Sequence, residues 1–304
     1  MVAAADEQQD DAVMNWMGQL LGGTWVTRQK LPDGSPIARV SYDWHPDRGG
    51  MILRGVLAGC HGEGILAHDP VRRGVYYVHL HGADTVHFGS LSLDDDTLIR
   101  EYRALVGAPV QWISRERFAG PDTLHVEMEC LEGKQKGLRL AMDYDRVFES
   151  SARLPSPPTS STGDAALGRL AELVGSWQTP GTLPDGRPVA ELHYELREDG
   201  KLLRGVGRIG ENATHSWVGM DARAKKQFYL DSHGSGSLLF GHYSLRAREA
   251  TVSFRSVVGP PGVWETRGRM VAPDRYEARI RTISDGEPQG EGHEVVLIRA
   301  VSRQ

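Results

Sequence analysis

The sequence has few cysteines, no long apolar run and no basic cluster. Only two cysteines, Cys60 and Cys130, occur among 304 residues, so we expect free thiols in a reducing cytoplasm and no disulfide framework. No apolar stretch is long enough to cross a bilayer as a helix, and residues 1–11 lack the basic and apolar regions of a signal peptide. A net charge of −5 with scattered Lys and Arg argues against nucleic-acid binding. We therefore expect a cytoplasmic protein that binds neither membranes nor nucleic acids.

The main feature that is present is an internal repeat with an offset of 152 residues. Trp25 matches Trp177, and the segment Leu31-Pro32-Asp33-Gly34 matches Leu183-Pro184-Asp185-Gly186. Further matches at the same offset are Tyr42 with Tyr194, Tyr77 with Tyr229, His81 with His233 and Trp112 with Trp264. One stretch is expected to slip by two residues, so that Leu53-Arg54-Gly55 matches Leu203-Arg204-Gly205. The repeat predicts a tandem duplication of one domain.

We expect two domains, residues 1–149 and 164–304, joined by a linker at residues 150–163. The linker is rich in Pro, Ser and Thr, which disfavour both helix and strand. Each copy opens with a helical pattern, over residues 11–21 in the first and 164–174 in the second. Short aromatic-rich segments separated by turn signals follow, which is typical of antiparallel strands. The predicted fold class is therefore mainly β: two tandem antiparallel β-barrels, each preceded by a short α-helix.

The opening of each copy resembles that of lipocalin-like (calycin-type) barrels. It carries the element Leu-x-Gly-x-Trp after the helical pattern, at Leu21-Gly22-Gly23-Thr24-Trp25 and Leu173-Val174-Gly175-Ser176-Trp177. In the second copy, the succession from Val218-Gly219-Met220-Asp221 to Pro273-Asp274-Arg275-Tyr276 resembles a bacterial lipocalin-like family of unknown function. The resemblance implies a barrel with an internal cavity, and it supplies no catalytic residues to carry over.

Three side chains of one predicted strand, Tyr77, His79 and His81, form the candidate catalytic set. Strand alternation places them on one face. Their counterparts in the second copy, which we include among candidate ligand-binding residues, are Tyr229, Asp231 and His233. If this face points into the barrel, it lines a pocket in which an imidazole can act as a general acid or base. If it points outward, these are ordinary polar residues.

Metal and haem are alternatives that the sequence does not favour. His79, His81 and His87 make the first copy rich in imidazole, which is a common metal ligand. However, the carboxylate spacing of cupins is missing, and the second copy has Asp231 in place of His79. Haem-binding relatives have a glycine-rich strand after the opening Trp, and this chain lacks one, so His293 is not expected to bind haem. We expect no metal and no cofactor.

Arg54, His87 and Trp112 complete the candidate ligand-binding residues. An arginine inside a barrel would recognise a carboxylate or enolate through a forked contact. The structural alternative, which we favour, is that Arg54 covers the opening tryptophan through a cation–π contact. Trp112 is expected in the wall or core of the barrel, with stacking on a ligand as the alternative.

The predicted function is binding of a small, largely apolar organic molecule in the cavity of a barrel of about eight strands. Tandem lipocalin-like domains resemble natural-product cyclases, so a cofactor-independent cyclase or isomerase of biosynthesis is one form of this prediction. The alternative is a non-catalytic carrier or an interaction scaffold. Because His79 and His87 have Asp231 and Leu239 as counterparts, the first barrel is predicted to be the working one. No feature of the sequence indicates an oligomeric state.

Overall fold

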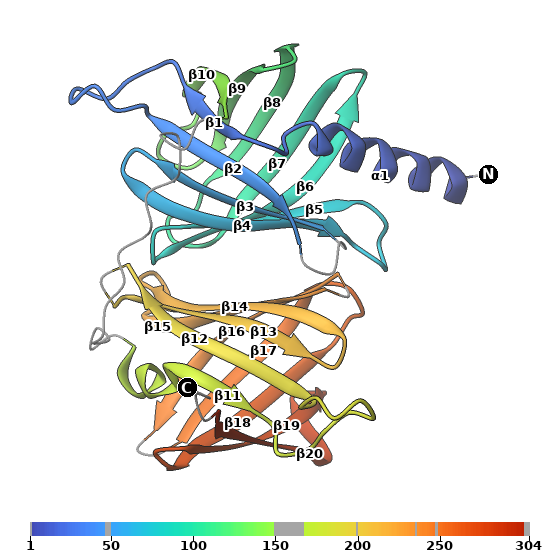
Figure 1. Ribbon diagram of the computed structural model, residues 1–304, viewed down its shortest axis with the longest axis vertical. Coiled ribbons are helices and arrows are strands. Elements are labelled where there is room, and N and C mark those ends of the chain that lie inside the picture. The colour runs from blue at the N-terminus through green and yellow to red at the C-terminus, as the bar shows by residue number, and fades with distance from the viewer. Residues whose placement is uncertain are drawn as a thin grey trace. The chain divides into compact units, whose positions relative to one another are not determined.

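The computed structural model describes residues 2–45, 50–148, 167–198, 200–234, 236–246 and 249–300. The chain divides into two compact units, residues 1–157 and 158–304. Within the described residues, each unit forms one closed antiparallel barrel of ten strands (Figure 1). The predicted fold class of two tandem antiparallel barrels is therefore confirmed. The predicted linker at residues 150–163 lies outside the described residues.

The first unit begins with helix α1 (Val2–Gly18) and continues as an up-and-down series of strands (Figure 1). These strands are β1 (Thr24–Thr27), β2 (Ala38–Trp44), β3 (Gly50–Leu57), β4 (Cys60–His68), β5 (Val75–His81), β6 (Thr85–Asp94), β7 (Thr97–Val106), β8 (Gln111–Gly120), β9 (Thr123–Glu132) and β10 (Arg139–Val147). Each strand pairs with its neighbours in sequence. The short strand β1 pairs with both β2 and β10, which closes the barrel.

The second unit repeats this order after the 3₁₀ helix η2 (Gly168–Leu173). Its strands are β11 (Gly175–Gln178), β12 (Ala190–Arg197), β13 (Leu202–Ile209), β14 (Asn212–Asp221), β15 (Lys226–His233), β16 (Ser237–Arg246), β17 (Glu249–Val258), β18 (Val263–Ala272), β19 (Arg275–Ser284) and β20 (Glu287–Arg299). Strand β11 pairs with β12 and β20 and closes the second barrel in the same way.

Two expectations about these barrels are corrected by the structure. Each barrel has ten strands within the described residues, where about eight were expected. The second barrel is preceded by a six-residue 3₁₀ helix and not by an α-helix. Residues 164–166 of the predicted helix lie outside the described residues. A short 3₁₀ segment suffices here, because Leu170 and Leu173 are the buried residues that it supplies to the barrel core.

The strand register keeps the 152-residue offset where the sequence suggested a slip. Leu53 lies directly across from Tyr42 in the first barrel, and Gly205 lies directly across from Tyr194 in the second. The structural counterpart of Leu53 is therefore Gly205, and the predicted slip that matched Leu53 with Leu203 is wrong. A shift of two residues keeps the same side chains on the inner face, so the hydrophobic pattern could not reveal the error.

Trp25 and Trp177 occupy equivalent positions in the two barrels, as predicted. Each is only 1% exposed. The indole NH of Trp25 donates a hydrogen bond to the carbonyl of Leu20 at 2.8 Å, and that of Trp177 donates to the carbonyl of Leu173 at 2.6 Å. Each tryptophan thus ties its opening strand to the segment that precedes it.

The arginine that covers each tryptophan comes from the chain segment at the end of that copy. The guanidinium carbon of Arg146 lies 4.5 Å from the ring centre of Trp25, and that of Arg299 lies 4.4 Å from that of Trp177. The prediction that Arg54 covers the opening tryptophan is therefore wrong. Arg54 lies in β3 with its side chain on the outer face of the barrel.

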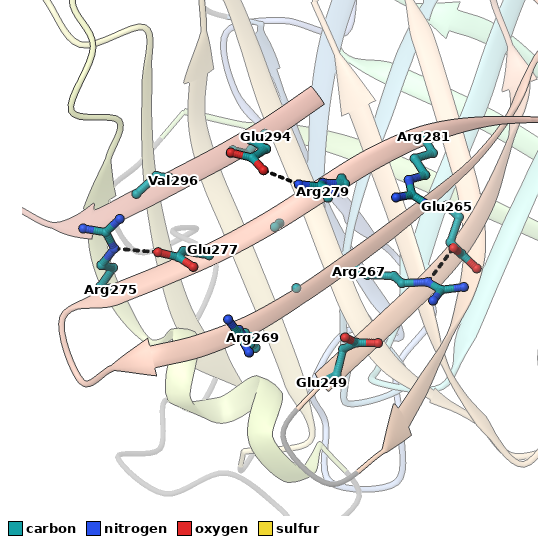
Figure 2. A pocket seen from close by; sticks show the side chains of 13 residues that line it. Glu249, Glu265, Arg267, Arg269, Arg275, Glu277, Arg279, Arg281, Glu294 and Val296 are labelled. Atoms are coloured by element: carbon teal, nitrogen blue, oxygen red, sulfur yellow. Dashed lines mark hydrogen bonds and ion pairs between the residues drawn. The ribbon is translucent and has the colours of Figure 1, made fainter. Parts of the chain in front are cut away.

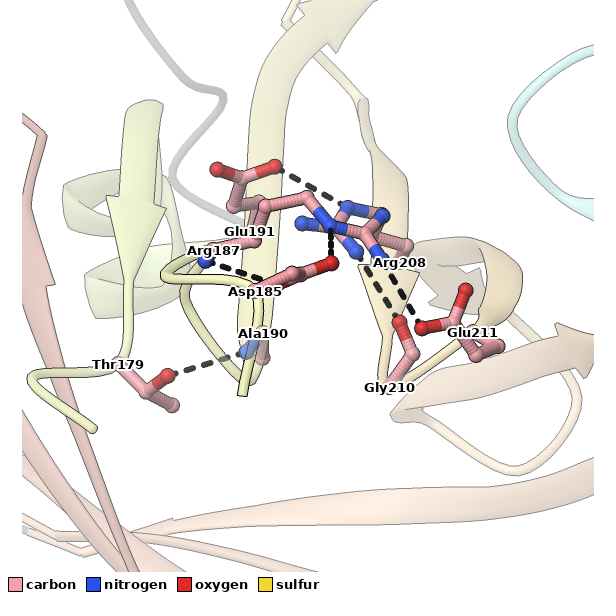
Figure 3. Close-up of polar contacts among 8 residues, drawn as sticks. All are labelled: Thr179, Asp185, Arg187, Ala190, Glu191, Arg208, Gly210 and Glu211. Carbon is pink, nitrogen blue, oxygen red and sulfur yellow. Dashed lines mark hydrogen bonds and ion pairs between the residues drawn. The ribbon is translucent and has the colours of Figure 1, made fainter. Parts of the chain in front are cut away.

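The Leu-Pro-Asp-Gly repeat forms the same turn in both copies. Asp185 Oδ1 accepts a hydrogen bond from the backbone NH of Arg187 at 3.0 Å, and Asp33 accepts one from the residue two positions later at 2.9 Å. Gly186 has a φ of 85°, which favours glycine. Arg187 also donates to Glu211 at 3.0 Å, which joins this loop to the β13–β14 turn (Figure 3).

Candidate functional site

The candidate strand face points into the first barrel. Tyr77 is buried in the core cluster together with Leu91. Because side chains alternate along a strand, His79 and His81 of β5 share the inner face with Tyr77. His87 of β6 lies directly across from His79, so it faces the same way. These aromatic and imidazole side chains therefore line the interior.

The end of this interior that α1 covers is apolar. Trp16, Met17 and Leu20 from α1 and the segment after it belong to the same buried cluster as Leu98 and Leu124. A hydrogen bond from the Trp16 indole NH to the carbonyl of Asp96, at 2.9 Å, fixes the helix to the β6–β7 turn. The histidines lie toward the opposite ends of their strands.

A buried ion pair lies beside Tyr77. Arg100 and Glu116 are 7% and 5% exposed, and a guanidinium nitrogen lies 3.1 Å from the carboxylate. The Ser114 hydroxyl donates a hydrogen bond to the same carboxylate at 2.9 Å. Burial disfavours the charged guanidinium, but the facing Glu116 carboxylate and the surrounding tyrosines together raise the pKa of Arg100. The Arg100 guanidinium carbon lies 4.5 Å from the Tyr77 ring centre, so a permanent cation packs on this phenol.

The three imidazoles of the inner face form an open cluster next to Tyr77. The ring centres of Tyr77 and His79 are 5.9 Å apart, and those of His79 and His81 are 6.2 Å apart. The ring of His87 lies 5.3 Å from that of Tyr102.

These imidazoles are uncharged at neutral pH. Burial lowers the pKa of His79 well below its ordinary value, and the neighbouring histidines lower it further. Burial also lowers the pKa of His81, and lowers that of His87 to about 4. None of the three rings hydrogen-bonds to a residue in the described part of the chain. Each neutral ring therefore keeps one donor and one acceptor that a ligand could use.

The second barrel uses the equivalent face for an internal network. The buried Asp231 carboxylate accepts hydrogen bonds from Thr214 at 2.7 Å and from the Tyr229 hydroxyl at 2.6 Å. It also pairs with His233 Nε2 at 3.1 Å. Burial disfavours the carboxylate, yet the charge of His233 and the hydrogen bonds from His233, Tyr229 and Thr214 together lower the pKa of Asp231, while Asp231 raises the pKa of His233. The polar groups here are satisfied by one another.

The two faces differ through a linked exchange of residues. Gly62 and Thr214 occupy the same register position, each directly across from the last histidine of its face. In the first barrel the His79 imidazole takes up the space that a Cβ at Gly62 would need. In the second barrel the shorter Asp231 stands at the equivalent place, and Thr214 binds it. In the first barrel the large His79 ring thus lies against a glycine, and in the second barrel the smaller Asp231 carboxylate lies against the Thr214 hydroxyl.

Arg54 lies outside the first barrel, which corrects its assignment as a ligand-binding residue within the cavity. It alternates with Leu53, a member of the core cluster, so its side chain points away from the interior. On the outer face it pairs with Asp43 at 3.0 Å and with Glu63 at 3.4 Å.

Trp112 lies in the inner wall of the first barrel. It is buried and stands directly across from Tyr102, whose ring faces His87. In the second barrel the equivalent Trp264 stacks on Phe254 with ring centres 5.8 Å apart. Trp112 is therefore placed beside the histidines, in contrast to Arg54.

Arg100 and Glu116 are residues of this interior that the repeat pattern did not single out. Their counterparts at the 152-residue offset are Val252 and Gly268. In the second barrel the Tyr276 hydroxyl occupies the space beside Gly268. The sequence does contain a signal for Arg100 and Glu116. They are a charged pair at inward-facing positions of one copy, and the other copy has an apolar and a small residue at those positions.

The described residues contain no group of three or more His, Cys, Asp or Glu side chains placed to hold a metal ion. The rings of His79, His81 and His87 share an interior but do not converge on one point. Across the described ranges, no helix is long and apolar enough to cross a membrane.

No protein-family model matches the chain, and no curated protein matches it. Among solved structures it is similar to a protein of unknown function from the DUF3598 family of Nostoc punctiforme. That match has 13% sequence identity and covers 94% of this chain and 97% of that chain, with a TM-score of 0.25. At this TM-score the likeness carries no argument about function.

Proposed function

We propose that the first barrel binds one small, largely apolar organic molecule that carries a hydroxyl or carbonyl group. The observation that supports this most is the set of three neutral imidazoles, His79, His81 and His87, which face the interior without a hydrogen-bond partner in the described chain. All three side chains are half-buried, so their ring nitrogens are open to the interior and can hydrogen-bond a hydroxyl or carbonyl group of a ligand.

The chemistry of the surrounding wall supports this class of ligand. Tyr77, Tyr102 and Trp112 contribute aromatic surface, and the Arg100–Glu116 pair is internally neutralised. An interior without net charge favours an uncharged ligand, and a few polar groups in an aromatic pocket would fix its orientation. The lipocalin-like resemblance of the two Leu-x-Gly-x-Trp elements supports the same proposal.

A cofactor-independent isomerase or cyclase is the catalytic form of this proposal. Burial lowers the pKa of His79 and His81, which makes each ring a weak base, so this form of the proposal requires a ligand proton acidic enough for an imidazole to accept. Burial raises the pKa of Tyr77, so its hydroxyl stays protonated at neutral pH and can donate a hydrogen bond to a ligand carbonyl. The carrier form of the proposal needs the same contacts and no proton transfer.

The test is titration of the full chain with N-phenyl-1-naphthylamine, an uncharged apolar fluorescent probe, in the wild type and in matched variants. His81→Ala should weaken binding about tenfold or change the emission of the bound probe, while His233→Ala, at the twin position, should leave both unchanged. Energy transfer to the probe should decrease in Trp112→Phe and persist in Trp264→Phe. Equal responses of the twin variants would contradict the first barrel as the binding site.

A further inference from the structure

The outer face of strands β17 to β20 carries a groove lined by arginine and glutamate side chains (Figure 2). Its volume is about 430 Å³, which is within the range of pockets that bind small molecules. The groove runs over the backbone of β18 and β19 at Gly268 and Ala278. Five arginines line it: Arg267, Arg269, Arg275, Arg279 and Arg281.

Two of these arginines have no acidic partner among the residues that the structure describes. The other three form ion pairs, namely Arg267 with Glu265, Arg275 with Glu277 and Arg279 with Glu294 (Figure 2). Neither Arg269 nor Arg281 makes a side-chain hydrogen bond or ion pair within the described ranges, and the Nε of Arg281 is buried without a partner. Both guanidinium groups are therefore available to an anion.

The strand register adds a like-charge contact at the centre of the groove. Arg267 and Arg279 lie directly across from each other on β18 and β19. Each is already paired with a glutamate, Glu265 or Glu294, which offsets the repulsion between directly opposed like charges, so an added anion gains more at the unpaired Arg269 and Arg281.

The first barrel offers an internal comparison. The β19 arginines of the groove, at 275, 279 and 281, have as counterparts at the 152-residue offset Thr123, Glu127 and Glu129. Two of the three differences reverse the charge from acidic to basic. The register is the same in both barrels here, since Glu129 pairs with Ile113 as Arg281 pairs with Glu265. The excess of guanidinium groups is therefore specific to the second copy.

We propose that this groove binds a small molecule with two anionic groups, carboxylates or phosphates, one contacted by Arg269 and the other by Arg281. Figure 2 shows these two side chains toward opposite ends of the groove, with Arg267 and Arg279 between them. Arg269 is across from Glu277 and Arg281 is across from Glu265, so the two arginines are four positions apart, roughly 13 Å along the strands. Long, flexible arginine side chains can shorten that span, which fits an elongated ligand with separated acidic ends.

Calorimetric titration of the full chain tests the proposal with two-headed and one-headed probes. The two-headed probes are suberate and fructose 1,6-bisphosphate, and the one-headed probes are acetate and inorganic phosphate. At least one two-headed probe should bind about tenfold more tightly than the one-headed probe with the same head group. Which pair shows this difference identifies the head group as carboxylate or phosphate.

Matched variants locate the site. The double change Arg269→Gln and Arg281→Gln removes two unpaired charges and orphans no carboxylate, so it should reduce two-headed binding to the one-headed level. The control is Arg115→Gln with Arg117→Gln, at the equivalent strand of the first barrel, which should change nothing. Circular dichroism and thermal unfolding should show both variants folded.

With these probes and variants, three outcomes would overturn the proposal. These are no binding of either two-headed probe, equal affinity for one-headed and two-headed probes, and equal losses in the control variant. Binding of an acidic heptapeptide without binding of suberate or fructose 1,6-bisphosphate would also overturn it, since the partner would then be a protein segment. None of these results depends on the uncharged probe in the first barrel.

Discussion

The imidazole of His79 occupies the space that a side chain at Gly62 would need, so these two residues of neighbouring strands are fitted to each other. The carbonyl oxygen of Leu80 lies 2.9 Å from the same point, so the backbone also leaves no room for a methyl group.

We predict that Gly62→Ala displaces the His79 ring. Because both a side chain and a backbone carbonyl must shift, the free energy of unfolding should decrease by about 1–3 kcal/mol. Urea unfolding measures this change, and the uncharged probe should bind more weakly to the folded variant. The control is Gly120→Ala, whose Cβ would meet no atom within 4 Å, and its effect should be within about 0.5 kcal/mol. Similar losses in both variants would show that the fit between Gly62 and His79 is unimportant.

Arg100→Met should be among the most destabilising substitutions in the first barrel. It leaves the Glu116 carboxylate buried without its cation, which typically costs about 3–5 kcal/mol. The double variant Arg100→Met with Glu116→Leu removes both charges and should recover much of that loss, as urea unfolding will show. If the double variant is less stable than Arg100→Met alone, the pair contributes through packing and not through charge.

The two barrels should respond in opposite directions to acidification from about pH 8 to pH 5. In the first barrel, the pKa values of His79 and His87 are lowered, so below about pH 6.5 the unfolded chain binds protons that the folded barrel does not. The first barrel therefore becomes less stable as the pH decreases. In the second, Asp231 raises the pKa of His233, so its contribution is complete below about pH 6.5 and is lost as the pH rises through the folded pKa. The lowered pKa of Asp231 means that its own contribution is lost only below about pH 4.

Pulse-labelling hydrogen exchange in urea, with one pulse pH for all samples, can follow peptides of β5 and β15 separately. His233→Gln should abolish the response of the second barrel and leave that of the first. His125, on the outer face of the first barrel, acts in the opposite sense because Asp143 raises its pKa, so the comparison is best made in a His125→Gln background. Parallel pH responses of both barrels in that background would contradict the assigned shifts.

Tyr229→Phe should destabilise the second barrel by about 1.5–3 kcal/mol. It removes a donor from a buried, charged acceptor, and such hydrogen bonds are the stronger kind. Tyr243, whose ring centre is 5.9 Å from that of Tyr229, makes no side-chain hydrogen bond to the described residues and serves as a control. Tyr243→Phe should change the free energy of unfolding by about 0.5 kcal/mol or less. The prediction is wrong if the two variants are equally stable.

Much of the fold follows from the sequence because the chain contains its own comparison. Matches such as Trp25 with Trp177 locate equivalent residues, and strand alternation alone places Tyr77, His79 and His81 on one face. The number of strands does not follow, because closure by a four-residue strand such as β1 leaves almost no periodic signal.

The candidate site is less accessible to such reasoning. Arg54 is repeated as Arg204 in the sequence, yet it lies outside the barrel, since repetition of a motif does not specify which face it occupies. Arg100 and Glu116 meet across β7 and β8, and only knowledge of which residues of these strands face inward relates them. The polar groups of an inner face can hydrogen-bond to one another, as at Asp231, or lack such partners in the described chain, as at His79. The difference depends on interatomic distances, which a sequence pattern does not contain.

The pairing of the first strand of each copy with its last, β1 with β10 and β11 with β20, determines when each barrel can close during synthesis. Thr24 pairs with Val147, and Trp177 pairs with Arg299, so the closing contacts join residues more than a hundred positions apart. A nascent first copy therefore exposes two unpaired sheet edges on the ribosome until its tenth strand has left the exit tunnel. By then translation of the second copy has begun, and its early strands resemble those of the first. Closure of the first barrel before β11 and β12 emerge would keep strands of one copy from completing the sheet of the other.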